Sequence, residues 1–332
     1  MRAFDYVSPT RVDEALRLLA ADGDGGTRLL AGGTDLLPLM KADVAAPTRL
    51  VNVKALPGLA GITYDATHGL RLGGLTRLAE VETSPLVRER YPLLAEALAV
   101  AATPQLRNMA TVAGNLLQRS RCWYFRNPRF HCWLKGGEAC PAHDGESQVA
   151  AILGGGPCYS AHPSDLAPAL LALDARLWLR GLGGERTLAI GELYAAPEAG
   201  RRTETVLAPD ELLVAVEVPP LPAGTRGTYL KAMDRKLWAF ALVGVAAVLR
   251  LEGGRVAQAR LALGGVAPIP WRAREAEAAL LGAEPTAAVF GRAADAALAA
   301  AEPLAKNGYK LPLTRALIQR ALAAAAGFRA SD

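Results

Sequence analysis

All four cysteines of this 332-residue chain lie between residues 122 and 158, at Cys122, Cys132, Cys140 and Cys158. The segment around them, Arg119–Pro157, is rich in glycine, proline and aromatic residues. It has neither the two-residue period of a strand nor the 3.6-residue period of a helix. The pattern predicts an irregular insertion in an otherwise regular fold, and it predicts that the four thiols share one site.

Four uses of such thiols can be compared. Buried free thiols would scatter along the chain, and disulfides need an oxidising compartment. A structural zinc ion takes four thiolates, but its ligands usually come in CxxC pairs, and this chain has none. A [4Fe-4S] cluster also takes four thiolates and accepts wide, irregular spacing. The residues alone leave zinc and iron–sulfur open, and His131 and His143 are expected to lie outside the ligand set.

The composition bounds the rest of the chain. Hydrophobic residues make up 51% of it, which is enough to bury a full core, and its length exceeds that of one ordinary domain. The formal net charge is +5, but the excess is dilute, and no Lys/Arg run could follow a phosphate backbone. Two or three globular domains that do not bind nucleic acid are therefore expected.

The N-terminal sequence has neither the apolar core nor the cleavage site of a signal peptide. The uncharged apolar stretch Trp238–Leu249 is too short to span a membrane. A soluble cytoplasmic protein is expected, or a periplasmic one if a signal-bearing partner subunit exports it in folded form.

Local periodicity predicts a mixed α and β fold. Strands are predicted at residues 29–31, 48–56, 61–66, 69–76, 175–180 and 186–190, and helices at 12–20, 78–102 (broken at Ser84-Pro85) and 164–173. A proline-rich junction, Val218–Gly227, predicts a domain boundary. Beyond it, strands joined at Gly253-Gly254 and alanine-rich helices are expected, with residues 242–249 open to either a strand or a buried helix.

Three polar stretches are candidate ligand sites. In LLAGGTDL, Leu29–Leu36, a strand ends in Gly-Gly, so that successive backbone N–H groups can converge on an anion. ATVAGNLL, residues 110–117, contains a Gly114-Asn115 pair typical of a turn. In HPSDLAPALLAL, Ser164 can cap a helix that has Asp165 in its first turn. An ordinary turn or cap also explains each stretch, and their joint occurrence is the stronger signal.

Together with LALGGVAPIPWRAREAE and NGYKLPLTRALIQRAL near the C-terminus, these stretches resemble the FAD-binding medium subunit of the molybdenum hydroxylases. That family includes xanthine dehydrogenase, aldehyde oxidoreductases and carbon monoxide dehydrogenase, and the resemblance covers essentially the whole chain. The cysteine insertion resembles two branches with an additional [4Fe-4S] cluster, the bacterial periplasmic aldehyde oxidoreductase and 4-hydroxybenzoyl-CoA reductase. RCWYFRN, CPA and HPSD are closer to the first.

The resemblance implies an α+β fold in two parts. A bilobal FAD-binding domain of the vanillyl-alcohol-oxidase type is expected over residues 1–222, with lobes 1–57 and 58–222 and an iron–sulfur insertion at about 119–160. A smaller α+β C-terminal domain is expected over residues 226–328. The sequence has no GxGxxG after a strand, so a dinucleotide fold of that kind is not expected.

The resemblance also implies roles for single residues. The backbone from Leu30 to Leu36 should wrap the FAD pyrophosphate, and Asp165 should bond the ribose or adenine end. Lys231 should lie near the flavin ring, where a cation raises the flavin potential. The implied cofactor-binding set is Leu29, Leu30, Ala31, Gly32, Gly33, Thr34, Asp35, Leu36, Thr111, Gly114, Asn115, Asp165 and Lys231, with Thr111, Gly114 and Asn115 in a second flavin-side turn. The implied ligands of the [4Fe-4S] cluster are Cys122, Cys132, Cys140 and Cys158.

The implied function is electron transfer, on FAD and a [4Fe-4S] cluster, within a molybdenum-dependent aldehyde (or xanthine-type) oxidoreductase, and no residue of this chain is predicted to be catalytic. A large molybdenum-cofactor subunit and a small [2Fe-2S] subunit would complete a heterotrimer or a dimer of heterotrimers. Electrons would pass through the small subunit to FAD and on to an external acceptor, for which ferredoxin is a candidate. Two alternatives stay open: the beta subunit of a 4-hydroxybenzoyl-CoA reductase, and a zinc-stabilised scaffold that has lost its flavin.

Overall fold

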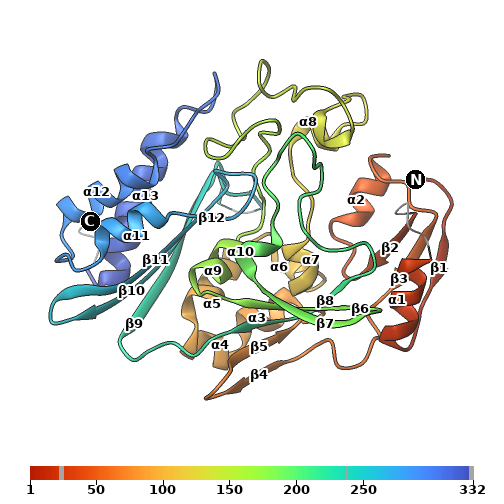
Figure 1. The fold of residues 1–332 in the computed structure, drawn as a ribbon, viewed down its shortest axis with the longest axis horizontal. Coiled ribbons are helices and arrows are strands. Elements are labelled where there is room, and N and C mark those ends of the chain that lie inside the picture. Colours follow the sequence, from red (N-terminus) through yellow and green to blue (C-terminus); the bar gives the residue numbers. More distant parts are fainter. Residues whose placement is uncertain (22–25, 237, 329–332) are drawn as a thin grey trace.

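The computed structural model describes residues 1–21, 26–236 and 238–328, and three sheets follow one another along this part of the chain (Figure 1). The first sheet is parallel, in the order β1-β3-β2, with β1 (Asp5–Val7), β2 (Thr27–Leu30) and β3 (Arg49–Asn52). Helix α1 (Val12–Ala20) buries Ala15, Leu16 and Leu19 on one face, against Val51 and its neighbours. Helix α2 (Leu36–Lys41) follows β2 after a short loop.

The second sheet has five antiparallel strands in the order β4-β5-β8-β6-β7. Its strands are β4 (Ile62–Asp65), β5 (Gly69–Gly73), β6 (Arg176–Gly181), β7 (Gly184–Ala189) and β8 (Leu212–Val218). The helices of this region are α3 (Leu78–Thr83), α4 (Pro85–Arg90), α5 (Pro92–Ala99), α6 (Pro104–Arg107), α7 (Val112–Leu116), α9 (Leu166–Ala172) and α10 (Ile190–Leu193). They pack with the sheet around the largest hydrophobic core of the described chain.

The helical stretch predicted over residues 78–102 differs from the structure in the number of its helices. It was expected in two pieces, and the structure divides it into three, because Pro92 as well as Pro85 begins a new helix. Proline favours the first position of a helix and cannot donate the hydrogen bond that a helix interior needs.

The third sheet is antiparallel, in the order β12-β11-β10-β9, with β9 (Thr225–Ala232), β10 (Val243–Glu252), β11 (Arg255–Gly264) and β12 (Trp271–Arg272). Helices α11 (Arg274–Leu280), α12 (Ala287–Ala297) and α13 (Lys310–Ala326) cover one face. The other face joins the core of the preceding region through residues such as Ala246 and Val248. Residues 242–249, which the sequence left open, therefore belong mainly to a strand.

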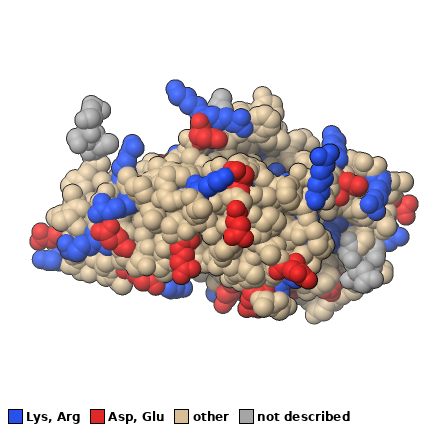
Figure 2. Space-filling view, turned by 90° about the horizontal axis from the view of Figure 1, so that it is seen from above, with Lys and Arg blue, Asp and Glu red and all other residues tan. Residues whose placement is uncertain are grey.

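The segment with the four cysteines lies above these layers in Figure 1 as a set of loops. Its regular elements are one short helix, α8 (Trp123–Arg126), and a 3₁₀ turn, η1 (Trp133–Lys135). Its small apolar cluster joins Leu39 of α2 to Phe125 and Cys132. The face that carries these loops mixes basic and acidic side chains with large uncharged areas (Figure 2). None of the described helices is long and apolar enough to cross a membrane.

Candidate functional site

The glycine loop, residues 31–35, connects β2 to α2. A Cβ atom on Gly32 would lie 1.9 Å from the carbonyl oxygen of Met109, so only glycine allows this loop to touch the chain that leads into α7. Gly33 has a φ of +72°, a conformation that side chains with a Cβ rarely adopt. The close approach and the positive φ together fix the path of the backbone.

The backbone N–H groups of this loop are available to a ligand. Among the described residues, the amides of Gly32, Gly33 and Thr34 donate to no hydrogen-bond acceptor, although all three residues are partly buried. Unpaired amides in a partly buried loop cost free energy unless water or a ligand accepts from them. Three successive free N–H groups at a glycine turn suit a phosphate, and the loop therefore fits the pyrophosphate of FAD.

The second candidate stretch, ATVAGNLL, forms a helix rather than the predicted turn. Gly114 and Asn115 lie within helix α7, and neither has a positive φ, so the turn expected there is wrong. The reason is Thr111, whose hydroxyl accepts from the amide of Gly114 at 3.2 Å and caps the helix. A Cβ atom on the exposed Gly114 would lie 2.9 Å from that hydroxyl, so glycine leaves the cap undisturbed.

The third candidate stretch, HPSDLAPALLAL, is hydrogen-bonded to the second, ATVAGNLL, through Ser164 and Asn115. The Ser164 hydroxyl donates to Oδ1 of Asn115 at 2.5 Å and accepts from the amide of Ala167 at 3.0 Å, which is the capping role predicted for it. His162 is buried with its ring against Tyr194, 4.7 Å between centroids. Burial lowers the pKa of His162 to about 3, so its ring is neutral at physiological pH.

Asp165 and Lys231 form one buried ion pair, at 2.9 Å between Oδ2 and Nζ. The Tyr229 hydroxyl donates to Oδ1 at 2.8 Å, and Lys231 also donates to the carbonyl of Val100. Burial raises the pKa of Asp165, although the nearby ammonium opposes this. The sequence placed Asp165 and Lys231 at different ends of FAD, whereas the structure joins them, because the third sheet packs against α9.

Asp35 also has protein partners. Its carboxylate forms ion pairs with Arg126 at 2.6 Å and Arg121 at 2.8 Å, and it accepts from the amide of Arg119 at 2.9 Å. The carboxylate of Asp35, a member of the predicted cofactor-binding set, is thus held by the cysteine insertion. Leu29, Leu30, Ala31 and Leu36 flank the glycine loop, where Leu30 is buried in a cluster with Met40 and Leu50.

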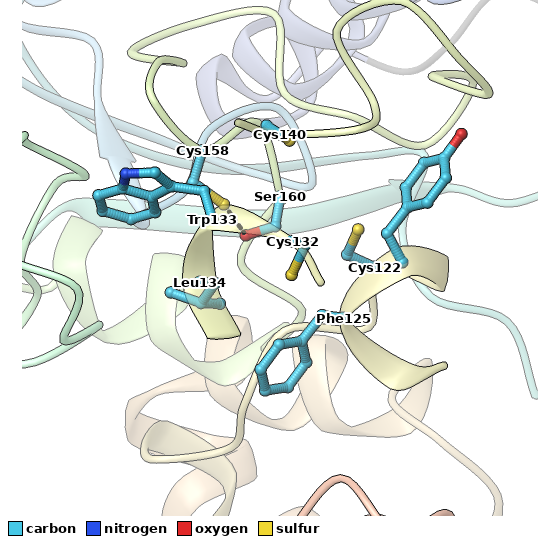
Figure 3. Close-up of a pocket in the computed structure, with 9 residues that line it drawn as sticks. Cys122, Phe125, Cys132, Trp133, Leu134, Cys140, Cys158 and Ser160 are labelled. Carbon is cyan, nitrogen blue, oxygen red and sulfur yellow. Dashed lines mark hydrogen bonds between the residues drawn. The ribbon is translucent and has the colours of Figure 1, made fainter. Parts of the chain in front are cut away.

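The four cysteines line a single cavity (Figure 3). Its other lining residues are Tyr124, Phe125, Trp133, Leu134 and Ser160. Cys132 and Cys158 are buried, Cys122 and Cys140 are half-buried, and none of the four forms a disulfide. Interaction with the Cys158 thiol lowers the pKa of Cys140 to about 6, while the same interaction and burial raise the pKa of Cys158.

The four thiols do not converge on one point. A tetrahedral zinc ion with Zn–S bonds near 2.3 Å needs its sulfur ligands roughly 3.8 Å apart. No three His, Cys, Asp or Glu side chains among the described residues are grouped so that they could hold one ion. In a [4Fe-4S] cluster each thiolate binds a different iron, so the sulfur atoms surround a volume rather than a point. The cavity brings four ligands of the required type together, but the described residues form no metal-binding group in this structure.

Several residues that organise the site were not predicted. Glu204 accepts from the side chain of Arg119 and, at 3.1 Å, from the amide of Ser120. Arg202 donates to the carbonyls of Trp133 and Gly137, the latter at 2.7 Å. Both lie in an irregular segment between α10 and β8, and no motif in the sequence connects them to the cysteines.

Comparison with known proteins identifies the family. Residues 2–221 match the family described as the FAD binding domain in molybdopterin dehydrogenase, and residues 228–325 match the CO dehydrogenase flavoprotein C-terminal domain. The chain is 40% identical to the aldehyde oxidoreductase FAD-binding subunit of Escherichia coli K12, over 98% of this chain and 99% of that subunit. It is 32% identical to the carbon monoxide dehydrogenase medium chain of Hydrogenophaga pseudoflava, over 97% and 96% of the two chains.

A solved structure of carbon monoxide dehydrogenase from Hydrogenophaga pseudoflava superposes with a TM-score of 0.77 at 32% identity, covering 98% of this chain and 97% of that one. The fold and these matches define an FAD-binding subunit of an oxidoreductase complex. The chain belongs to the molybdenum hydroxylase family, as one of its FAD-binding medium subunits. The free amides and the two glycines of the glycine loop are consistent with that cofactor.

Proposed function

We propose that this chain is the FAD- and [4Fe-4S]-carrying electron-transfer subunit of a molybdenum-dependent aldehyde oxidoreductase. The observation that carries the proposal is the cavity lined by all four cysteines of the chain. The identity of 40% to an aldehyde oxidoreductase subunit, over nearly the full length of both chains, supports the substrate class of the complex. Both cofactors carry electrons, and the aldehyde would be oxidised on the large subunit.

The chain's own residues hold and shield these cofactors. The amides of the glycine loop would bind the pyrophosphate, as the free N–H groups suggest. Phe125, Trp133 and Leu134 would keep water away from the cluster, which together with nearby cations tunes its potential. Within this proposal the FAD-binding domain is of the bilobal vanillyl-alcohol-oxidase type over residues 1–222, and residues 226–328 form the C-terminal domain.

The proposed partners follow from the same class of complex. A large molybdenum-cofactor subunit and a small [2Fe-2S] subunit would assemble with this chain, and an external acceptor such as a ferredoxin would receive the electrons. The complex would be cytoplasmic, or periplasmic if a signal-bearing subunit exports it.

One set of cofactor assays tests the proposal. FAD, iron, sulfide and zinc are measured on anaerobically prepared wild-type chain and on the variants Cys132→Ser and Gly32→Ala. We expect about four iron and four sulfide per FAD in the wild type. Cys132→Ser should lose most of the iron and keep FAD, since the buried Cys132 thiol lines the cysteine cavity and would bind the cluster rather than FAD.

Gly32→Ala should lose most of the FAD, because the added methyl group collides with Met109. Gly183→Ala is its control, since a Cβ there meets nothing within 4 Å and the residue has no positive φ. FAD together with zinc and no iron would make the cysteine site structural. Neither FAD nor iron in a folded sample would refute the proposed function.

A further inference from the structure

The carboxylate of Asp35 is the direct contact between the glycine loop and the cysteine insertion. It follows immediately after the free amides of Gly32, Gly33 and Thr34, and its side chain is only 17% exposed. Both of its oxygens accept from the insertion: Oδ1 from the guanidinium group of Arg126, and Oδ2 from the amide of Arg119, while Arg121 forms an ion pair with Oδ1 at 2.8 Å. Charge-assisted hydrogen bonds of this kind are among the strongest in proteins.

The segment that Asp35 holds leads directly into the first cysteine. The amide of Ser120 donates to Glu204 at 3.1 Å, and the Ser120 hydroxyl accepts from the amide of Cys122 at 3.1 Å. Arg126, one helical turn beyond Cys122, donates to the carbonyl of Ser120 at 2.7 Å while it binds Asp35. Residues 119–122 are therefore held by Glu204 on one side and by Asp35 and Arg126 on the other. Of these three residues, Asp35 is the one that belongs to the glycine loop.

Asp35 has little capacity left for a ligand. A carboxylate offers about four lone-pair positions; two of them accept from Arg119 and Arg126, and the Arg121 guanidinium lies 2.8 Å from Oδ1 as an ion pair. Movement of the glycine loop would shift all three contacts together. Conversely, release of residues 119–122 would leave the half-buried charge of Asp35 with Arg126 as its one remaining partner among the three.

We propose that Asp35 is a positioning residue that couples the FAD loop to the cysteine segment. FAD bound at the loop orders residues 119–122, and order in residues 119–122 favours FAD binding, since coupling between two sites is reciprocal. This inference rests on the proposed function, because that places the pyrophosphate at Gly32–Thr34.

Hydrogen exchange on the full chain, stripped of metal by a chelator, tests the coupling without depending on the cluster. The amides of Arg119, Ser120 and Cys122 are followed with and without saturating FAD in wild type, Asp35→Asn and Asp43→Asn. Asp43 is the matched control because it is a 51% exposed aspartate at the far end of α2, paired only loosely with Arg2 at 3.5 Å. Its φ of 57° suits asparagine as well as aspartate.

We expect FAD to slow exchange at these amides by about tenfold in wild type and in Asp43→Asn, and by less than about twofold in Asp35→Asn. A residue with a purely structural role would change exchange equally with and without FAD. Equal FAD-dependent slowing in Asp35→Asn and wild type would overturn the inference.

A second variant guards against misfolding of Asp35→Asn. Arg126→Gln leaves Asp35 intact but removes its closest donor, and it should reduce the FAD-dependent slowing by at least about threefold. If Arg126→Gln retains the full wild-type effect, the coupling does not run through this carboxylate. Failure of the wild type to bind FAD would refute the proposed function, whereas FAD binding without any change at residues 119–122 would refute only the coupling.

Discussion

The glycine loop and the cysteine insertion touch through Asp35, but different forces hold them in place. The glycine loop is fixed at one end by β2 in a parallel sheet and at the other by α2, and its neighbours Leu30, Met40 and Leu50 form a small apolar cluster. Its shape therefore depends on regular hydrogen bonding and on packing. The ligand groups that it offers are backbone amides.

The cysteine insertion has almost no regular hydrogen bonding of its own. Charged side chains reach the backbone carbonyls instead: Lys135 donates to those of Tyr124 at 3.1 Å and Asn127 at 2.6 Å, and Arg202 donates to that of Gly137 at 2.7 Å. The ligand groups that it offers are side-chain thiols. The comparison teaches that the glycine loop is shaped by the scaffold, whereas the cysteine insertion is held by scattered polar contacts.

The largest expected effect concerns the scaffold. Lys231→Met would leave the Asp165 carboxylate buried without its cation, since the two side chains are 1% and 5% exposed. Loss of one partner of such a pair costs about 3–5 kcal/mol, so the free energy of unfolding in urea should fall by that amount. Arg315→Met is the control, because the Arg315–Asp295 pair is exposed and surface ion pairs contribute little to stability. Equal losses in the two variants would show that the buried pair does not support the scaffold.

A smaller effect on the free energy of unfolding is expected from pH, through His162 in the same region. Burial lowers the pKa of His162 to about 3 from its usual value near 6.5. Between these values the unfolded chain binds the extra proton and the folded chain does not, so the free energy of unfolding falls as the pH drops below 6.5. The loss from this group is about 2 kcal/mol between pH 7 and pH 5.

Urea titrations at the two pH values check this on the wild type and on His162→Gln. The variant lacks the titrating ring, and its stability should fall by about 2 kcal/mol less over this interval. If both proteins lose the same stability, the acid sensitivity of the scaffold arises from other groups.

The sequence predicted the periodic parts of the fold because their signal is local. Helix α1 and strands β3 to β5 appear where the apolar spacing indicated. Strand β10 was ambiguous for a physical reason. Val243 and Val245 on one of its faces pack into the core of the third sheet, and Ala246 and Val248 on the other face pack into the core of the preceding region. A strand buried on both faces has no polar alternation, so its sequence is hard to distinguish from that of a buried helix.

The candidate site was predictable in part. The grouping of the four cysteines around one cavity follows their grouping in the sequence. The contacts of Asp35 with Arg126 and of Asp165 with Lys231 span 91 and 66 positions, and no local pattern indicates them. The helix at Gly114 shows the opposite case, since a Gly-Asn pair indicated a turn but the Thr111 cap prevailed.

The smallest expected effect tests the insertion itself. Arg202→Met removes the donor to the carbonyls of Trp133 and Gly137 and the cation that lies 5.0 Å from the centre of the Trp133 ring. Since these contacts tie a loop to the scaffold without entering the core, the variant should open the loop locally. The rate of hydrogen exchange at residues 133–137 should rise by about fivefold, which corresponds to a fall of about 1 kcal/mol in the free energy of local opening. The free energy of global unfolding should change by less than about 0.5 kcal/mol.

Arg201→Met is the matched control for this change, because the neighbouring Arg201 is paired with Glu198 at 3.4 Å rather than with the insertion. It should leave exchange at residues 133–137 as in the wild type. If Arg202→Met instead lowers global stability as much as it opens the loop, the insertion unfolds together with the sheets and the two regions are one cooperative unit. A purely local effect means that the cysteine insertion can rearrange while the glycine loop keeps its shape, except where Asp35 connects them.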